Sequence, residues 1–189
     1  MSSSISICSN ALLALGQHPI NSFDEATDHA RLCANIYPTV RDDLLRRHPW
    51  NCAIKRVVLS PVSDSPTFEY RFQFALPGDT IRVLSVGDGD GSYETPYRTE
   101  GNRLLANVDA LHLRYVFRND DESTWDAALV NLAEATMAAR LAYAVTGSAS
   151  LRDSLTQEAA YLLRQAKAID GQEDPPETLG GYPTYESRF

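Results

Sequence analysis

The sequence predicts a mixed α+β protein, in which a helical bundle of about four helices carries an inserted antiparallel β-sheet lobe and an extended C-terminal tail. Three observations predict this class. Apolar residues recur every three or four positions before residue 50 and again after residue 120, which is typical of amphipathic helices. Between these segments the period falls to two, which is typical of strands. From residue 171 onwards Pro, Gly and acidic residues dominate, and such a segment cannot build a core.

The first helix is expected over residues 3–15, where apolar residues share helical spacing and Gly16 provides a C-terminal stop. A second, longer helix is expected to begin at a capping box formed by Ser22 and Glu25. Pro38 lies inside this helix and should kink it or split it in two, because proline removes a backbone donor and clashes with the preceding turn. The apolar stripe of the second helix comprises Ala26, Ala30, Cys33, Tyr37, Val40 and Leu44.

The second helix is expected to end at His48, because Pro49 disfavours helical geometry in the residue before it. Trp50 then has a large surface to bury directly after the helix. We expect it to fix the angle between the bundle and the sheet lobe. Basic residues gather around this turn in an otherwise acidic chain. The hinge and subunit-interface candidates are Arg46, Arg47, His48, Trp50, Lys55 and Arg56.

Four to six antiparallel strands are expected to make the lobe. Strand-like chemistry begins at residues 57–59, and the alternation of aromatic and polar residues over 68–74 predicts the clearest strand. Others are expected at 81–86, 97–99, 103–105 and 111–117, with His112 on the solvated face of the last. The Gly-Asp repeat at 87–91 indicates a loop tip, since Tyr93 and Thr99 stand where a calcium-binding EF-hand loop starting at residue 88 needs Gly and Glu.

Two further helices are expected after the strands. Ser123 should cap a helix whose alanine-rich residues 128–145 are apolar nearly all round, which indicates a central position. Ser150 should cap the last helix, which is expected to end at Asp170-Gly171. Residues 1–50 and 120–170 are therefore predicted to form a discontinuous helical bundle domain. Residues 51–119 would form the β-sheet lobe and residues 171–189 an extended C-terminal arm.

Composition narrows the possible functions. The net charge of −8 disfavours binding DNA through a broad basic face. No apolar run approaches the roughly 20 residues of a membrane helix, and no secretory signal is expected at the start. The odd number of cysteines argues against a disulfide framework or a zinc site. Buried free thiols at Cys8, Cys33 and Cys52 and synthesis in a reducing cytoplasm are expected instead.

No catalytic, cofactor-binding or metal site is expected. None of the four histidines has a His or Cys partner at metal-ligand spacing, and no nucleophile or phosphate-loop motif occurs. Asp42-Asp43 is explained by pairing with Arg46 and Arg47 at helical spacing. The acids at 120–122 are explained by a helix dipole.

The tail contains residue types that are enriched at protein interfaces. An acidic tail gains little from placing aromatic side chains in water, so we expect it to dock on a partner. The contact candidates are Tyr182, Tyr185, Arg188 and Phe189.

Three consecutive segments resemble one known family. They are residues 7–20 (ICSNALLALGQHPI), 22–38 (SFDEATDHARLCANIYP) and 40–56 (VRDDLLRRHPWNCAIKR). Their order and spacing resemble the tail tubular protein A family of short-tailed, podovirus-like phages, the head-to-tail adaptors between portal and tail nozzle. The resemblance covers about the first third of the chain, and the later sheet followed by two helices agrees loosely.

This resemblance implies a structural virion protein that forms a dodecameric ring. It implies binding to the portal protein on one side and to the tail nozzle protein on the other, with the C-terminal arm reaching the portal. DNA would pass through the lumen without sequence-specific binding, and neither a cofactor nor a membrane would be involved.

Two alternatives stay open from the residues. One is a virion-associated glycan hydrolase, which needs two carboxylates and would use acids such as Asp42, Asp120 or Glu122. The other is a tail completion or assembly factor that is absent from the mature particle.

Overall fold

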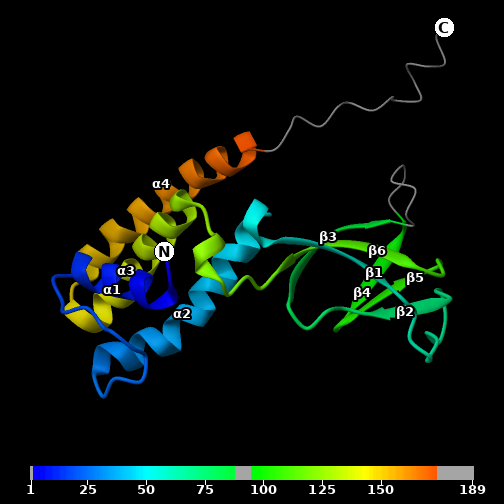
Figure 1. The fold of residues 1–189 in the computed structure, drawn as a ribbon, viewed down its shortest axis with the longest axis horizontal. Helices are drawn as coiled ribbons and strands as arrows, with labels where there is room; N and C mark the ends of the chain where they lie inside the picture. The colour runs from blue at the N-terminus through cyan, green and yellow to red at the C-terminus, as the bar shows by residue number, and fades with distance from the viewer. Residues whose placement is uncertain (1, 88–94, 174–189) are drawn as a thin grey trace, which may run out of the picture.

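A helical domain and a lobe of β-strands lie next to each other and meet at the end of one long helix (Figure 1). The computed structural model describes residues 2–87 and 95–173. The helices are α1 (Ser4–Ala14), α2 (Asp28–Arg47), α3 (Ala127–Thr146) and α4 (Ala149–Glu173), and all six strands fall between α2 and α3. The α+β class and the insertion of the strands between pairs of helices are therefore confirmed.

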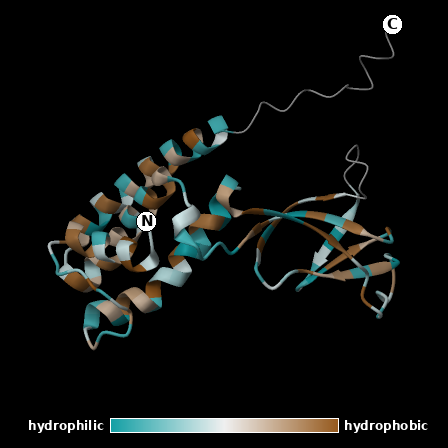
Figure 2. Ribbon diagram, viewed as in Figure 1, coloured by the Kyte–Doolittle hydropathy of each residue, from teal (hydrophilic) through white to brown (hydrophobic). Residues whose placement is uncertain are grey.

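Helix α3 is the centre of the helical domain, because it packs against each of α1, α2 and α4. Its buried side chains come from several faces, as the alanine-rich sequence predicts, and small residues such as Ala138 and Ala142 allow close approach of the neighbouring helices. The core also contains Leu12 of α1 and Leu44 of α2, both of which are almost fully buried. Figure 2 shows hydrophobic residues on all four helices.

The predicted start of α2 at a Ser22–Glu25 capping box is wrong. The carboxylate of Glu25 accepts hydrogen bonds from the backbone N–H groups of Asn21 (2.6 Å) and Ser22 (3.2 Å), so it closes a turn ahead of the helix. Thr27 is the true N-cap, and its hydroxyl accepts from the backbone of Ala30. The helix then continues through Pro38 to Arg47 without being split.

The caps of the two C-terminal helices also differ from the prediction. Ser123 lies in a short 3-10 turn (Glu122–Thr124), and Asp126 caps α3 by accepting from the backbone N–H of Ala128 at 2.7 Å. Ser148 rather than Ser150 caps α4, since its hydroxyl accepts from the backbone of Leu151. Helix α4 runs to Glu173, two residues beyond the predicted end at Asp170-Gly171.

The lobe consists of two three-stranded antiparallel sheets. One has the strand order β1 (Ile54–Leu59), β6 (Leu111–Phe117), β3 (Thr80–Gly87); the other has the order β2 (Phe72–Ala75), β5 (Arg103–Ala106), β4 (Tyr97–Glu100). Side chains from both sheets share one core, which includes Phe74, Leu104, Leu111 and Leu113. The predicted hairpin is confirmed, with Glu100 paired to Arg103 across Gly101, whose φ of +57° suits glycine.

The strand predicted over residues 68–74 is mostly wrong. Only residues from Phe72 onwards are in β2, and Phe68 is 78% exposed. Glu69 has a φ of +72°, and the backbone N–H of Tyr70 donates to the carbonyl of Phe68, which forms a γ-turn. This turn reverses the chain where the sequence alternation indicates extended backbone.

Strand β6 belongs to both cores. Leu111, Leu113 and Tyr115 face the second sheet, as their alternation predicts. Val116 is fully buried on the opposite face, where it packs into the core of the helical domain. His112 also lies on that opposite face, but it is half-buried rather than solvated.

The two rival caps of α3 give a direct test. Replacing Asp126 with Ala should lower the free energy of unfolding by about 1 kcal/mol, because the backbone N–H of Ala128 loses its acceptor. Ser123→Ala serves as the matched control and should cost less. Urea unfolding followed by circular dichroism measures both. A larger loss for Ser123→Ala would show that the helix begins where the sequence alone places it.

Candidate functional site

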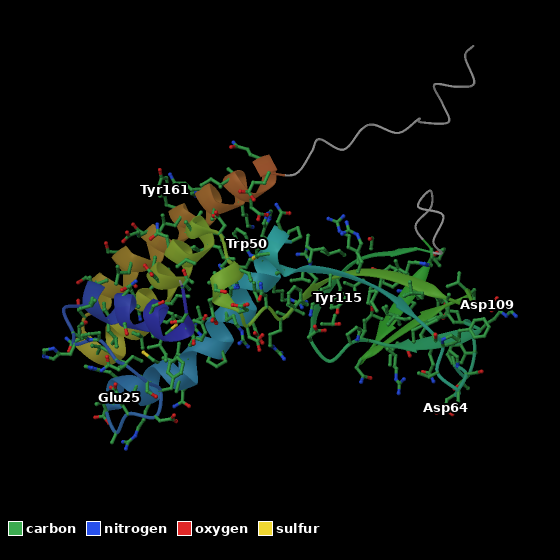
Figure 3. The ribbon with its side chains drawn as sticks, viewed as in Figure 1. Glu25, Trp50, Asp64, Asp109, Tyr115 and Tyr161 are labelled. Carbon is green, nitrogen blue, oxygen red and sulfur yellow. The ribbon has the colours of Figure 1, made fainter. Side chains whose placement is uncertain are left out.

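Trp50 holds the junction between the helical domain and the strands. Its side chain is 1% exposed, and its indole N–H donates to the carbonyl of Leu44 at 2.9 Å. This bond satisfies one carbonyl that the end of α2 leaves free. His48, the C-cap of α2, packs edge-to-face on Trp50 with ring centroids 4.7 Å apart. We call residues 48–53 the Trp50 corner; Figure 3 shows Trp50 at the junction end of the helical domain.

Asp170 of α4 ties the Trp50 corner to the C-terminal helix. One carboxylate oxygen lies 3.0 Å from His48 Nε2, and the other accepts from the backbone N–H of Asn51 at 3.0 Å. The side-chain amide of Asn51 also donates to the carbonyl of Asp170 at 3.1 Å. The carboxylate is thus a structural anchor. Sequence reasoning assigned Asp170 only to a helix end, because nothing in the sequence links it to residues more than 100 positions away.

The basic residues around the corner do not act as one cluster. Arg46 donates to the carbonyl of Ile81 in β3 at 2.7 Å, and Arg47 forms an ion pair with Asp43 at 2.7 Å. The pairing predicted between Asp43 and Arg47 at helical spacing is therefore confirmed. Asp42, however, does not pair with Arg46. It lies 3.0 Å from Arg41 and 2.9 Å from Arg118, which follows β6.

The side chain of Lys55 contacts two residues of the lobe. Its ammonium group lies 2.8 Å from Asp79 and 3.7 Å from the centroid of the Phe117 ring. Asp79 also accepts from the Tyr115 hydroxyl at 3.1 Å. Partial burial opposes ionisation of Asp79, but the hydrogen bonds from Lys55 and Tyr115 outweigh it and lower the pKa of Asp79. Burial, together with this carboxylate, raises the pKa of Tyr115 to about 12.

Arg56 is exposed, as are Arg46, Arg47 and Lys55, and no ion pair within the described residues involves Arg56. Its cross-strand partner in β6 is Arg114. The structure therefore brings Arg56 together with an arginine that sequence reasoning missed. The alternation in β6 could have indicated it, because Arg114 shares a face with His112.

Two of the three carboxylates that the hydrolase alternative would use, Asp42 and Glu122, are bound to other side chains of the protein. Asp42 is held by two arginines, as described above. Glu122 is buried, and it accepts a hydrogen bond from the Tyr37 hydroxyl at 2.7 Å. Burial and this neighbouring carboxylate raise the pKa of Tyr37. Asp120 is exposed, and none of the three lines any of the hollows described below.

Two of the three free cysteines, Cys8 and Cys33, are buried as predicted, and Cys52 is half-buried. Burial raises the pKa of the Cys52 thiol to about 11, with Asp170 adding to the shift. Over residues 2–87 and 95–173, no three His, Cys, Asp or Glu side chains group as a metal ion would require. No helix in this part of the chain combines the length and apolar character that crossing a membrane needs.

Hollows on the described part of the surface include the following three. One, of about 960 Å³, lies between α2 and α4 over α3, with an apolar floor that includes Leu44 and Leu132. A second, of about 320 Å³, lies beside Trp50, Trp125 and Asp170. The third, of about 630 Å³, lies on the open face of the β1–β6–β3 sheet and includes Arg56 and Arg114.

Two predicted features lie outside the described residues. One is the loop that continues the Gly-Asp repeat from residue 88. The other is the portal-contact set of the arm, namely Tyr182, Tyr185, Arg188 and Phe189. Of the predicted arm, only residues 171–173 are described, and they belong to α4.

Comparison of the chain with protein-family models and with curated protein sequences gives no match. The case for a function therefore depends on the residues and the geometry.

The Trp50 corner can be tested by truncation. Trp50→Ala should lower the free energy of unfolding by about 3–5 kcal/mol, because a buried aromatic side chain is replaced by a cavity. Trp50→Phe should cost less, since it keeps an aromatic ring in the core and loses part of the packing together with the bond to Leu44. Phe68→Ala is the exposed control and should change stability little. Denaturant unfolding measures all three. Equal values for Trp50→Ala and Phe68→Ala would contradict the assignment.

The Lys55–Asp79–Tyr115 contacts predict a pH dependence. A carboxyl group whose pKa is lowered by folding stabilises the protein above its unfolded pKa of about 3.9, and this contribution is lost as pH falls through the folded value. The stability of the native chain should therefore fall more steeply below about pH 4 than that of Asp79→Asn. Unfolding in urea at pH 7 and at stepwise lower pH measures the difference. Parallel curves would exclude this role for Asp79.

Proposed function

We propose that the protein is a structural virion protein, a head-to-tail adaptor that forms a dodecameric ring between portal and tail nozzle of a short-tailed phage. The observation that carries the proposal is the order and spacing of the segments at 7–20, 22–38 and 40–56, which resemble the tail tubular protein A family. The proposal assigns no catalytic role to the chain and places it in the virion after synthesis in the bacterial cytoplasm.

The location of these segments supports the proposal. They include most of α1, all of helix α2 except Thr39, the Trp50 corner, and the start of β1. Their side chains serve packing and the Trp50 corner, as the bond from Trp50 to Leu44 illustrates. A resemblance concentrated in residues that set the angle between two domains suits a ring component, because the subunit shape determines how copies fit together.

The charge of the chain suits a channel that DNA crosses. With a net charge of −8, the ring would avoid the many phosphate contacts that hold DNA in place. DNA could then slide through the lumen during ejection.

The hydrolase alternative draws no support from the carboxylates. Asp42 is paired with arginines and Glu122 with Tyr37, which leaves Asp120 as the exposed acid of the three. A zymogram on cell-wall glycan with Asp42→Asn, Asp120→Asn and Glu122→Gln discriminates the two functions. Activity that requires one of these acids would replace the adaptor proposal. The assembly-factor alternative is tested by mass spectrometry of purified virions, where an adaptor must be present.

The central test is assembly. The purified chain mixed with its portal protein should form a ring on one end of the portal, visible by electron microscopy. Trp50→Ala is the structural comparison, since a loosened corner should reduce the fraction of assembled rings. Failure of the native chain to form any complex would refute the proposal.

The arm can be tested by truncation after Glu173, the last described residue of α4. The truncated chain should keep its helical content and unfolding midpoint, because the described residues already form a core in each domain. It should bind the portal more weakly than the full chain, as co-sedimentation would show. Restoring the segment with Tyr182, Tyr185 and Phe189 changed to Ser is the matched control for length. Undiminished binding by both variants would exclude the arm as a portal contact.

A further inference from the structure

The open face of the β1–β6–β3 sheet gathers basic side chains. Arg56 and Ser85 both pair directly with Arg114, and in the next row Val58 and Gly87 pair with His112. Direct cross-strand partners project from the same face of a sheet. We call this surface, made of Arg56, Val58, Ser85, Gly87, His112 and Arg114, the basic face. It lines the hollow of about 630 Å³.

Neither the second sheet nor the helical domain covers the basic face. The other side of the sheet is covered by β2, β5 and β4, and the helical domain covers the end of β6 at Val116. Gly87 adds no side chain, and nothing lies within 4 Å of the position where its Cβ would stand. Val58 is 56% exposed and supplies an apolar patch beside the charges.

Among residues 2–87 and 95–173, no acidic side chain forms an ion pair with the two arginines of this face. Like charges directly opposite each other destabilise a strand pair, yet Arg56 and Arg114 stand in register. Arg114 Nε and His112 Nδ1 are also shielded from solvent without a hydrogen-bond partner. A buried polar group left unpaired costs about 1–3 kcal/mol. An anion bound on this face would relieve the repulsion between the two guanidinium groups.

We propose that the basic face binds an extended, carboxylate-rich segment of a partner protein. Guanidinium groups match carboxylates in a planar fork, and a chain of net charge −8 repels nucleic acid at long range. Strand β1 pairs only with β6 among the described strands, so its outer backbone groups are free to bind an added strand. Alternate side chains of that segment lie over the basic face, where acidic residues meet Arg56 and Arg114 and an apolar residue meets Val58.

Binding of a designed peptide tests this inference whether or not the chain forms a ring. The probe is a fluorescein-labelled peptide of four Glu-Val repeats, and the measurement is fluorescence anisotropy with the full chain at low salt. Arg114→Gln and Arg56→Gln should each weaken binding by about tenfold, which corresponds to loss of one charged hydrogen bond. Arg164→Gln, at an exposed position on α4, removes the same charge elsewhere and should leave binding unchanged.

Three results would overturn the inference. The first is that the native chain does not bind the peptide, or binds it with an affinity that neither Arg56→Gln nor Arg114→Gln lowers. The second is equal affinity for a peptide of Gln-Val repeats, which would show that carboxylates are not recognised. The third is displacement of the peptide by a short DNA duplex at a lower concentration than by unlabelled peptide, which would assign the face to phosphates. Circular dichroism confirms that each variant is folded, and the exposed position of Arg56 keeps one variant independent of packing.

Discussion

The burial of Trp50 and its bond to Leu44 are the constraint on which the arrangement of the two domains depends. A helix that ends before a proline leaves carbonyl groups without partners, and the indole satisfies one of them while filling the space beneath the helix end. Asp170 then fastens the same turn to α4 through His48 and Asn51. Residues distant in sequence thus contact the six residues of the Trp50 corner. These contacts set the direction in which β1 leaves the helical domain.

Strand β6 extends this constraint into the lobe. Because its two faces enter different cores, with Val116 among the helices and Leu113 between the sheets, the lobe is attached to the bundle by packing as well as by the chain itself. Arg118 beyond the strand pairs with Asp42 of α2, and Arg46 of α2 binds the backbone of β3. Such an attachment suits the adaptor role proposed above, since separate domains would otherwise rotate about a linker.

The charges divide into two groups with different roles. Arg47, Lys55 and Arg118 each pair with a carboxylate of their own chain. Their charges are therefore balanced within the fold and do not by themselves indicate a binding surface. Arg56 and Arg114 stand opposite each other instead, and neither forms an ion pair within the described residues. The basic cluster expected around the corner is thereby replaced by a smaller one on the sheet, and the surface proposed for binding moves from the helix end to the open strands.

The sequence by itself determined what local periodicity and composition control: the order of helices and strands, the central alanine-rich α3, the hairpin at Gly101 and the burial of Trp50. The order of elements and the hairpin depend on neighbours within a few residues, whereas the burial of Trp50 and α3 follows from the apolar surface that each presents. The tertiary structure alone decided the caps of α2 and α3, the γ-turn at Glu69, and the partnership of Asp170 with the corner. Several polar side chains compete for each such contact at similar local free energy, so long-range packing selects among them. The same reason applies to the basic face, because cross-strand register joins Arg56 to Arg114 across 58 positions of sequence.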